Sequence, residues 1–278
     1  MKGIVIRSLS GIVYIAVIVA GLMLGDVVFR CFMAVLTTLA IVEFYGLANS
    51  HRAGFAGKLL DVAGGVAAVL GLYALASGGC TAAVPYGVGY LCYIVARLTI
   101  QLYSRSPEAF RSLAFSLMSQ IYIALSIGLM SFIYCRGGFG GNMVLAMFIM
   151  IWLNDTGAFV VGSAIGRHKL FPRVSPKKSW EGFAGGVAFA IASAFLLKGA
   201  FGYAYTGASL GELLGMGAVV GIFATWGDLV ESLIKRSLGV KDSGSIIPGH
   251  GGILDRIDSL LLVSPALIIY FYLYSALS

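Results

Sequence analysis

Charged residues are scarce in this chain. Asp, Glu, Lys and Arg make up 11% of its 278 residues, whereas hydrophobic residues make up 59%. Apolar runs longer than about 18 residues recur, and each can cross the hydrocarbon core of a bilayer. The scarcity of charge therefore excludes an ordinary soluble domain and predicts a polytopic membrane protein.

The sequence also lacks the alternating apolar and polar residues of transmembrane β-strands, and its 38 glycines fit a barrel poorly. Backbone groups in lipid must pair within their own segment, so the spans must be helices. We predict an all-α transmembrane bundle of about nine spans. The expected spans are residues 10–25, 27–47, 59–78, 82–104, 111–135, 142–166, 177–203, 210–235 and 256–277.

No linker or low-complexity tract divides the chain, which predicts a single integral-membrane domain over residues 1–278. Its four cysteines have no C-x-x-C spacing, which argues against a thiolate metal or redox site. Glycine pairs such as Gly217 with Gly221 would let helices approach closely. The same pairs would serve packing within the bundle or the face of a homodimer, and the sequence does not separate the two.

The Lys and Arg residues are distributed unequally between the two predicted sides of the membrane. With the N-terminus placed in the cytoplasm, most of the 19 Lys and Arg residues fall on the cytoplasmic side. Arg30, Arg136 and Lys198 fall outside, and Arg97 is expected to snorkel to the inner surface. The net charge of +7 suits an anionic leaflet and phosphate ligands better than nucleic acid, for which no soluble domain is evident.

Three acidic residues lie within expected spans: Asp155, Asp228 and Glu231. A carboxylate at that depth is costly unless it is paired, bound to a metal or in contact with water in a cavity. Asp228 and Glu231 are three residues apart and share a helix face with Lys235. The spacing fits a metal site near the inner surface. A structural ion pair between Glu231 and Lys235 is the alternative.

A second carboxylate pair, Asp255 and Asp258, falls in the first turn of the last span with the same spacing. Part of this signal can be ordinary capping, because a helix N-terminus stabilises negative charge. Mg²⁺ takes one or two carboxylates together with phosphate oxygens and water. We therefore expect Asp228 to meet Asp255 or Asp258 across two helices.

Two cationic loops are expected to bind phosphate. The first joins the two acidic pairs and is rich in glycine, although it has no Walker A motif. The second spans residues 167–181, where Ser175 suits an N-cap and Pro176 the first helical position. Lys177 and Lys178 would then oppose the helix dipole unless an anion binds there. A plain positive-inside loop is the alternative.

The motifs resemble those of the phosphatidate cytidylyltransferases, also called CDP-diacylglycerol synthases. The resemblance covers residues 150–260 and includes the segments NDTGAFVVG and SPKKSWEG, where Ser179 stands in place of the commoner threonine. The family signature is matched at Ser232, Lys235, Arg236, Lys241, Asp242, Gly244, Pro248, His250, Gly251, Gly252, Asp255, Arg256 and Asp258. A spaced signature of this length rarely arises by chance.

The resemblance implies transfer of a cytidylyl group from CTP to phosphatidate, giving CDP-diacylglycerol and pyrophosphate. It implies Mg²⁺ and leaves room for a second, monovalent cation such as K⁺. Residues 1–140 would be helices without motifs, and residues 141–278 the catalytic helices and cytoplasmic loops of a bacterial inner-membrane enzyme. The rival class is an anion transporter or channel, although the polar groups gather at one membrane face rather than at the midplane.

The expected site follows from both arguments. Its catalytic residues are Asp228, Asp255, Asp258, Lys235 and Arg236. Mg²⁺ is expected on Asp228, Asp255 and Asp258, with Asp155 a further candidate. The substrate and phosphate contacts are expected at Ser175, Lys177, Lys178, Ser232, Lys241, His250, Gly251, Gly252 and Arg256.

Overall fold

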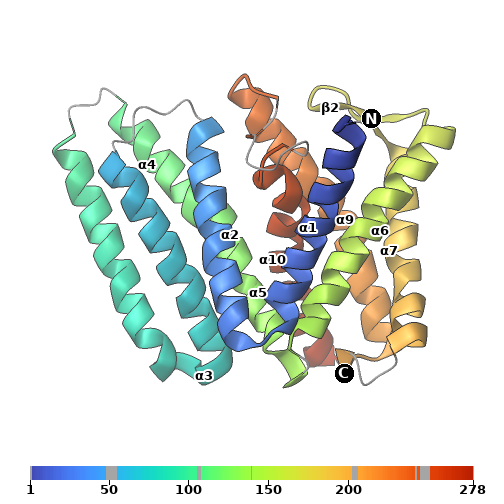
Figure 1. Ribbon diagram of the computed structural model, residues 1–278, viewed down its shortest axis with the longest axis horizontal. Helices are drawn as coiled ribbons and strands as arrows, with labels where there is room; N and C mark the ends of the chain where they lie inside the picture. Colours follow the sequence, from blue (N-terminus) through green and yellow to red (C-terminus); the bar gives the residue numbers. More distant parts are fainter. Residues whose placement is uncertain are drawn as a thin grey trace. The chain divides into compact units, whose positions relative to one another are not determined.

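The computed structural model describes residues 2–47, 55–104, 108–138, 140–201, 206–241, 243–244 and 251–277. Within these ranges the chain is almost entirely helical, apart from one short β-hairpin (Figure 1). The elements are α1 (Lys2–Met23), α2 (Asp26–Leu47), α3 (Phe55–Leu102), α4 (Ala109–Met118), the π-helix η1 (Ser119–Leu125), α5 (Ser126–Tyr134), the 3-10 turn η2 (Arg136–Gly138), α6 (Gly141–Ile165), β1 (Lys169–Phe171), β2 (Ser175–Ser179), α7 (Trp180–Phe201), α9 (Leu210–Ser237) and α10 (Leu254–Leu277).

The prediction of an all-α polytopic membrane bundle is confirmed. Seven described helical segments are long and apolar enough to cross a membrane. The longest, α3, has 48 residues and contains Gly79 in a non-helical conformation with φ 74°. Figure 1 shows α3 as two antiparallel arms, which correspond to the spans predicted at 59–78 and 82–104. The total of nine spans and the cytoplasmic N-terminus stay predictions.

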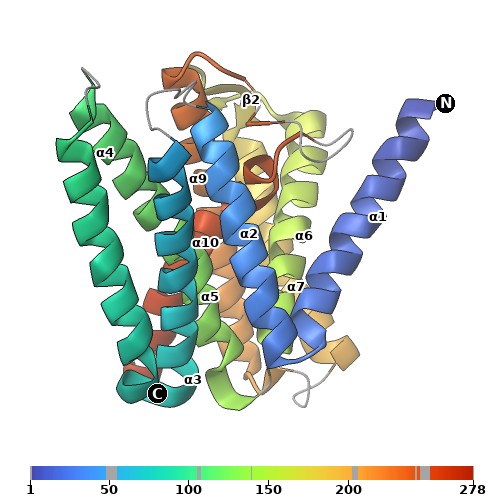
Figure 2. The same ribbon diagram turned by 60° about the vertical axis from the view of Figure 1, so that its left-hand side comes forward.

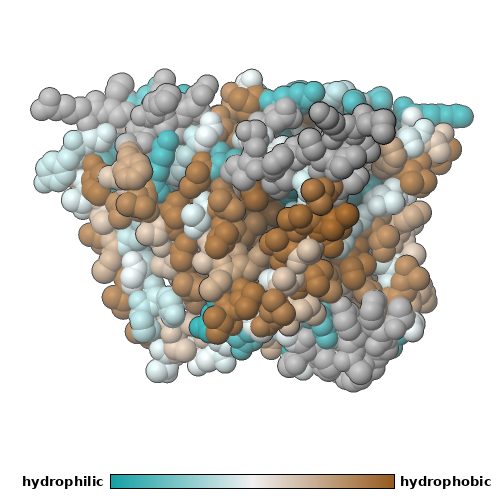
Figure 3. All heavy atoms as spheres, viewed as in Figure 1, coloured by the Kyte–Doolittle hydropathy of each residue, from teal (hydrophilic) through white to brown (hydrophobic). Residues whose placement is uncertain are grey.

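The apolar surface agrees with a lipid environment. Large apolar side chains are exposed along several helices, including Leu9 on α1, Val35 on α2 and Phe159 on α6. Figure 3 shows apolar residues over much of the middle of one face. Such exposure would be unfavourable in water but is expected where lipid tails are the solvent.

The chain divides into two compact units, which we describe separately. Unit 1 comprises Met1–Phe132 and Asp242–Arg256, and unit 2 comprises Ile133–Lys241 and Ile257–Ser278. The single domain expected over residues 1–278, and its division at residue 140, stay predictions.

Unit 1 is built on the packing of α2 against α3 and η1. Phe29, Met33 and Phe44 of α2 and Ile123 of η1 are buried in its core. Helix α1 joins α2 through a turn at Gly25 (φ 98°) and splays away from it toward the N-terminus (Figure 2). The core of this unit is therefore supplied mainly by α2, α3 and η1.

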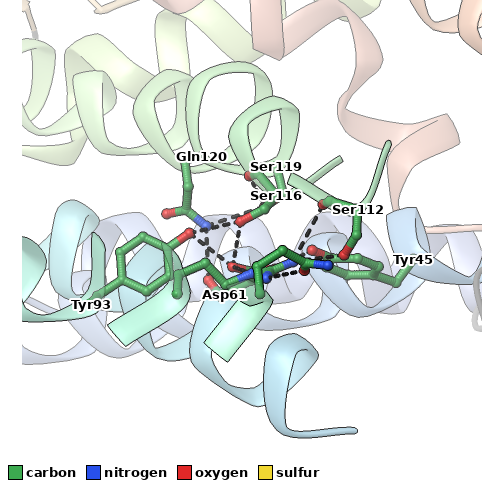
Figure 4. A network of polar contacts seen from close by, with 9 residues as sticks. Tyr45, Asp61, Tyr93, Ser112, Ser116, Ser119 and Gln120 are labelled. Atoms are coloured by element: carbon green, nitrogen blue, oxygen red, sulfur yellow. Dashed lines mark hydrogen bonds and ion pairs between the residues drawn. The ribbon is translucent and has the colours of Figure 1, made fainter. Parts of the chain in front are cut away.

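A buried polar network ties the arms of α3 to their neighbours (Figure 4). The Arg97 guanidinium lies 3.2 Å from the Asp61 carboxylate, and the two side chains are 4% and 0% exposed. Asp61 also accepts hydrogen bonds from Tyr93 (2.8 Å) and Ser116 (2.6 Å) and from Tyr45. The expectation that Arg97 snorkels to the membrane surface is therefore wrong, because a buried carboxylate on the adjacent arm of α3 holds its charge inside the bundle.

Unit 2 is built on α6, α7 and α9, which pack against one another. The contact between α7 and α9 depends on small residues. A Cβ atom on Gly217 would lie 2.6 Å from the Ala190 carbonyl oxygen, and one on Gly221 would lie 2.7 Å from the Val187 Cα atom. These glycines therefore serve helix packing within the unit.

Candidate functional site

The segment before α7 forms a β-hairpin, which overturns one expectation. Ser175–Ser179 is strand β2, antiparallel to β1, and α7 begins at Trp180. The N-cap of α7 is Ser179, whose Oγ accepts the Gly182 amide at 3.1 Å. The prediction that Ser175 caps this helix is therefore wrong. Strand pairing places Lys177 and Lys178 on β2, before the first turn of α7 rather than within it.

Lys177 and Lys178 line a cleft in unit 2 with a volume of about 380 Å³. Its walls come from α6, the hairpin, the start of α7, and α9. The lining residues are Asp155, Ala158, Phe159, Gly162, Ser163, Leu170, Lys177, Lys178, Ser179, Gly182, Phe183, Thr225 and Asp228. The structure therefore brings four predicted residues, Asp155, Lys177, Lys178 and Asp228, into one cleft, whereas Ser175 is not among the residues that line it.

Asp228 and Lys178 form the polar centre of this cleft. The Lys178 Nζ atom lies 2.8 Å from Asp228 Oδ2, and the two side chains are 23% and 40% exposed. Ser232, one turn further along α9, donates to Asp228 Oδ1 at 3.2 Å. Lys178 also donates to the Thr225 carbonyl oxygen at 3.3 Å. An ammonium group and a carboxylate are thus both fixed in place and both accessible from the cleft.

Helix α10 brings Asp258 close to α9. A Cβ atom on Gly227 would lie 2.5 Å from the Asp258 carbonyl oxygen, so only glycine allows the two backbones to approach so closely. Asp258 as a residue is half-buried, and its carboxylate lies within electrostatic range of Asp228, Glu231 and Asp155. Acidic residues from α6, α9 and α10 therefore gather in unit 2.

Glu231 and Lys235 form an ion pair of 2.8 Å on α9, with side chains only 3% and 11% exposed. This is the structural alternative to a ligand role for Glu231. The two residues lie one helical turn apart, and their pairing satisfies two charges that would be costly to bury separately. The role predicted for Lys235 in phosphate binding is not tested by this geometry.

The remaining cationic residues lie on the surface of the units. Arg236 and Lys241 of unit 2 and Arg256 of unit 1 are exposed, and Arg236 donates to the Val240 carbonyl oxygen at 3.3 Å. His250 lies outside the described residues. The phosphate contacts predicted for these side chains stay predictions.

Asp255 belongs to unit 1 and binds backbone amides of the loop between α9 and α10, residues 238–253, which we call the signature loop. Its Oδ2 atom accepts the Gly252 amide at 3.0 Å and the Ser243 amide at 3.2 Å. Gly251 has φ 84°, and a Cβ atom there would lie 2.9 Å from the same oxygen. This geometry braces the loop before α10 from the first turn of the helix, and it does not cap the amides of α10 itself. It leaves the predicted metal role of Asp255 untested.

In the half without motifs, two buried carboxylates were not identified from the sequence. Glu43 on α2 is 5% exposed, and Asp61 on α3 is fully buried. Both lie in apolar helices of the half without motifs. The available signal was an ionisable residue inside a long apolar run, which is costly unless the fold supplies partners.

A polytopic helical membrane protein whose cleft presents lysines beside carboxylates is suited to handling phosphate-bearing substrates at a bilayer. The comparisons agree with this class. The chain matches the model of the Cytidylyltransferase family over residues 5–274. It therefore belongs to the cytidylyltransferase family, a family of nucleotidyltransferases, as the signature predicted.

Similar proteins include several with the same name. A Phosphatidate cytidylyltransferase of Staphylococcus aureus (strain COL) is 35% identical over 274 residues, covering 94% of this chain and 96% of the relative. One of Staphylococcus epidermidis (strain ATCC 12228 / FDA PCI 1200) is 34% identical over 264 residues, with the same coverage. One of Staphylococcus haemolyticus (strain JCSC1435) is 41% identical over 170 residues, covering 61% of this chain and 63% of the relative.

Proposed function

We propose that this protein transfers the cytidylyl group of CTP to phosphatidate, giving CDP-diacylglycerol and pyrophosphate for phospholipid biosynthesis. The observation that carries the proposal is the cleft of unit 2, where Lys178 and Asp228 lie 2.8 Å apart with Lys177 on the same wall. Relatives named phosphatidate cytidylyltransferase match nearly the whole chain and supply the substrates of the proposal.

The proposed reaction needs little covalent help from the protein. The phosphate of phosphatidate is already anionic at neutral pH, so its oxygen can attack the α-phosphorus of CTP without a strong base. The bond between the α- and β-phosphates breaks, and pyrophosphate leaves. Positioning and neutralisation of charge then carry most of the catalysis. Lys177 and Lys178 are placed to hold phosphate oxygens by charge-assisted hydrogen bonds.

Asp228 and Asp258 are the ligands that unit 2 offers to Mg²⁺. Their like charges lie within electrostatic range of each other, and a cation would relieve their repulsion. No group of three acidic, histidine or cysteine side chains in the described part of the chain is arranged as ligands. Mg²⁺ needs only one or two protein carboxylates, because phosphate and water fill its remaining positions. When bound, it would neutralise charge on the reacting phosphates.

Asp155 lines the same cleft and is the further candidate ligand in unit 2. Asp255 stays a proposed ligand on the spacing of the acidic residues and on the resemblance. The monovalent cation, K⁺, and the homodimer are likewise proposals. We place the reaction at the cytoplasmic side of a bacterial inner membrane, because most Lys and Arg residues fall on the side predicted to be cytoplasmic.

The first test is pyrophosphate release from CTP by detergent-purified protein, with and without phosphatidate and Mg²⁺. Release should require both, and should fall by about 10²-fold or more in Asp228→Asn, which removes the charge but keeps the shape. Glu212→Gln is the matched control, since it neutralises a carboxylate on the same helix that pairs with Arg136 outside the cleft. It should retain activity per folded molecule.

The rival function, anion transport, predicts the opposite result. Folded protein supplied with phosphatidate and Mg²⁺ would then release no pyrophosphate from CTP or any other nucleotide. The same protein in liposomes would instead carry an anion flux that depends on Lys178. That pair of results would overturn the proposal.

A further inference from the structure

Glu43 is a buried carboxylate far from the signature in sequence but bound to it in space. It lies near the end of α2 and is 5% exposed. It accepts hydrogen bonds from the Ile253 amide at 2.8 Å, the Leu254 amide at 3.0 Å and the Ser243 hydroxyl. Two of these donors lie in the signature loop and the third, Leu254, is the first residue of α10; all of them belong to unit 1 with Glu43.

The space around Glu43 explains two glycines of the signature. A Cβ atom on Gly252 would lie 2.0 Å from Glu43 Oε1, and one on Gly244 would lie 2.9 Å from Glu43 Oε2. A side chain at either position would displace the carboxylate. Gly252 was expected to let the backbone approach phosphate, yet its lack of a side chain already serves the approach of Glu43.

Glu43 and Asp255 act on the same backbone from two sides. The Ser243 hydroxyl donates a hydrogen bond to Glu43, and the Ser243 amide donates one to Asp255 at 3.2 Å. Gly252 gives its amide to Asp255 at 3.0 Å while its Cα atom faces Glu43. The two carboxylates therefore share one hydrogen-bonded framework, and a shift of Glu43 would be transmitted to Asp255.

The charge of Glu43 also suits its place. Its carboxylate receives the amide of Leu254, the first residue of α10, where unpaired N–H groups concentrate partial positive charge. A distant helix thus supplies the anionic cap that fixes where α10 begins. Asp255 and Arg256 follow directly, so the start of α10 determines their direction.

We propose that Glu43 is a positioning residue for the transferase, fixing the signature loop and the first turn of α10 so that Asp255 is correctly oriented. The hydrogen bonds that Glu43 accepts in the described part of the chain all come from this segment, so its effect on substrates would pass through it. The inference rests on the proposed function, because the effect expected of Glu43 is on the rate of that reaction.

The test measures kcat, KM for CTP and the Mg²⁺ concentration for half-maximal activity in Glu43→Gln, Glu43→Asp and Ser243→Ala. Misplacement of about 1 Å can lower a rate by about 10²-fold. We expect Glu43→Gln to lower kcat by about 10-fold or more and to shift half-maximal Mg²⁺ upward. Ser243→Ala removes one of the three contacts and should lower kcat less than Glu43→Gln does. Glu43→Asp keeps the charge, so its loss of kcat should lie between those of the other two variants.

Asp61→Asn is the matched control. It removes the charge from another buried carboxylate of unit 1, which has several hydrogen-bond donors but no hydrogen bond to the described residues of the signature loop. It should lower stability, yet leave kcat, KM and half-maximal Mg²⁺ unchanged per folded molecule. A purely structural Glu43 would behave in the same way.

A second measurement needs neither substrate nor metal. Amide hydrogen exchange in the peptide containing Ile253 and Leu254 should accelerate in Glu43→Gln and stay at the parental rate in Asp61→Asn. Unchanged exchange and unchanged kinetic constants in Glu43→Gln, alongside an active parent protein, would overturn the inference. A parent that never releases pyrophosphate would instead overturn the proposed function, whereas the exchange result would still report on Glu43.

Discussion

Lys178 on strand β2 and Asp228 on helix α9 lie 2.8 Å apart, although 50 positions separate them in the chain. Their side chains are partly exposed to the cleft, so water screens the pair and its contribution to stability is small, about 0–1 kcal/mol. The pair therefore matters more for the charged groups that it exposes to a ligand in the cleft than for the stability of the fold.

Replacing Lys178 should therefore separate activity from stability. We expect Lys178→Gln to lower kcat/KM for CTP by about 10²-fold while the midpoint of thermal unfolding changes little. Lys169→Gln is the control, because Lys169 is an exposed lysine of strand β1 that does not line the cleft. Equal losses in the two variants would show that general positive charge, rather than the position of Lys178, matters.

Asp228 and Asp258 should respond to Mg²⁺ as a pair. Each single change to Asn should raise the Mg²⁺ concentration needed for activity, and the double variant should lose less than the product of the single losses. The reason is that both would act on one bound ion. Titration of activity with Mg²⁺ in the four proteins gives the coupling directly. Strictly multiplicative losses would indicate independent roles.

The Asp61 and Arg97 network should be a stability feature. Removing one charge, as in Arg97→Met, leaves a buried carboxylate uncompensated and is expected to cost about 3–5 kcal/mol. Neutralising both partners, as in Asp61→Asn with Arg97→Met, should recover part of that loss. Unfolding of the purified proteins in detergent measures both effects. A single variant as stable as the parent would contradict the buried ion pair between Asp61 and Arg97.

The hairpin makes a distinct prediction about two serines. Ser179→Ala removes the cap of α7 and should cost about 1 kcal/mol of stability. Ser175→Ala should change stability by less than about 0.5 kcal/mol, because Ser175 begins β2 and caps no helix. Comparison of the two unfolding midpoints tests the assignment, and the reverse order would restore the helix start at Ser175.

Sequence alone predicted the membrane class because the length of an apolar run and the need to satisfy backbone hydrogen bonds constrain it strongly. The pairing of Glu231 with Lys235 was also accessible, since it follows from the spacing of residues on one helix. Local rules of this kind need no knowledge of the tertiary fold.

The hairpin and the buried carboxylates depended on tertiary contacts. Ser175 and Pro176 have good propensities for a helix start, yet pairing with β1 favoured a strand. Glu43 and Asp61 find their partners on other segments, up to 211 residues away for Glu43. No periodicity in a single helix identifies such partners. This explains why the half without motifs carried more of the polar structure than its sequence indicated.

The most direct test of cytidylyl transfer uses CTP with a radioactive α-phosphorus and measures where the radioactivity goes. The parent protein with phosphatidate and Mg²⁺ should move this label into the organic phase as CDP-diacylglycerol, and Asp228→Asn should move almost none. Label that stays in the aqueous phase with folded parent protein, lipid and Mg²⁺ present would contradict cytidylyl transfer to phosphatidate.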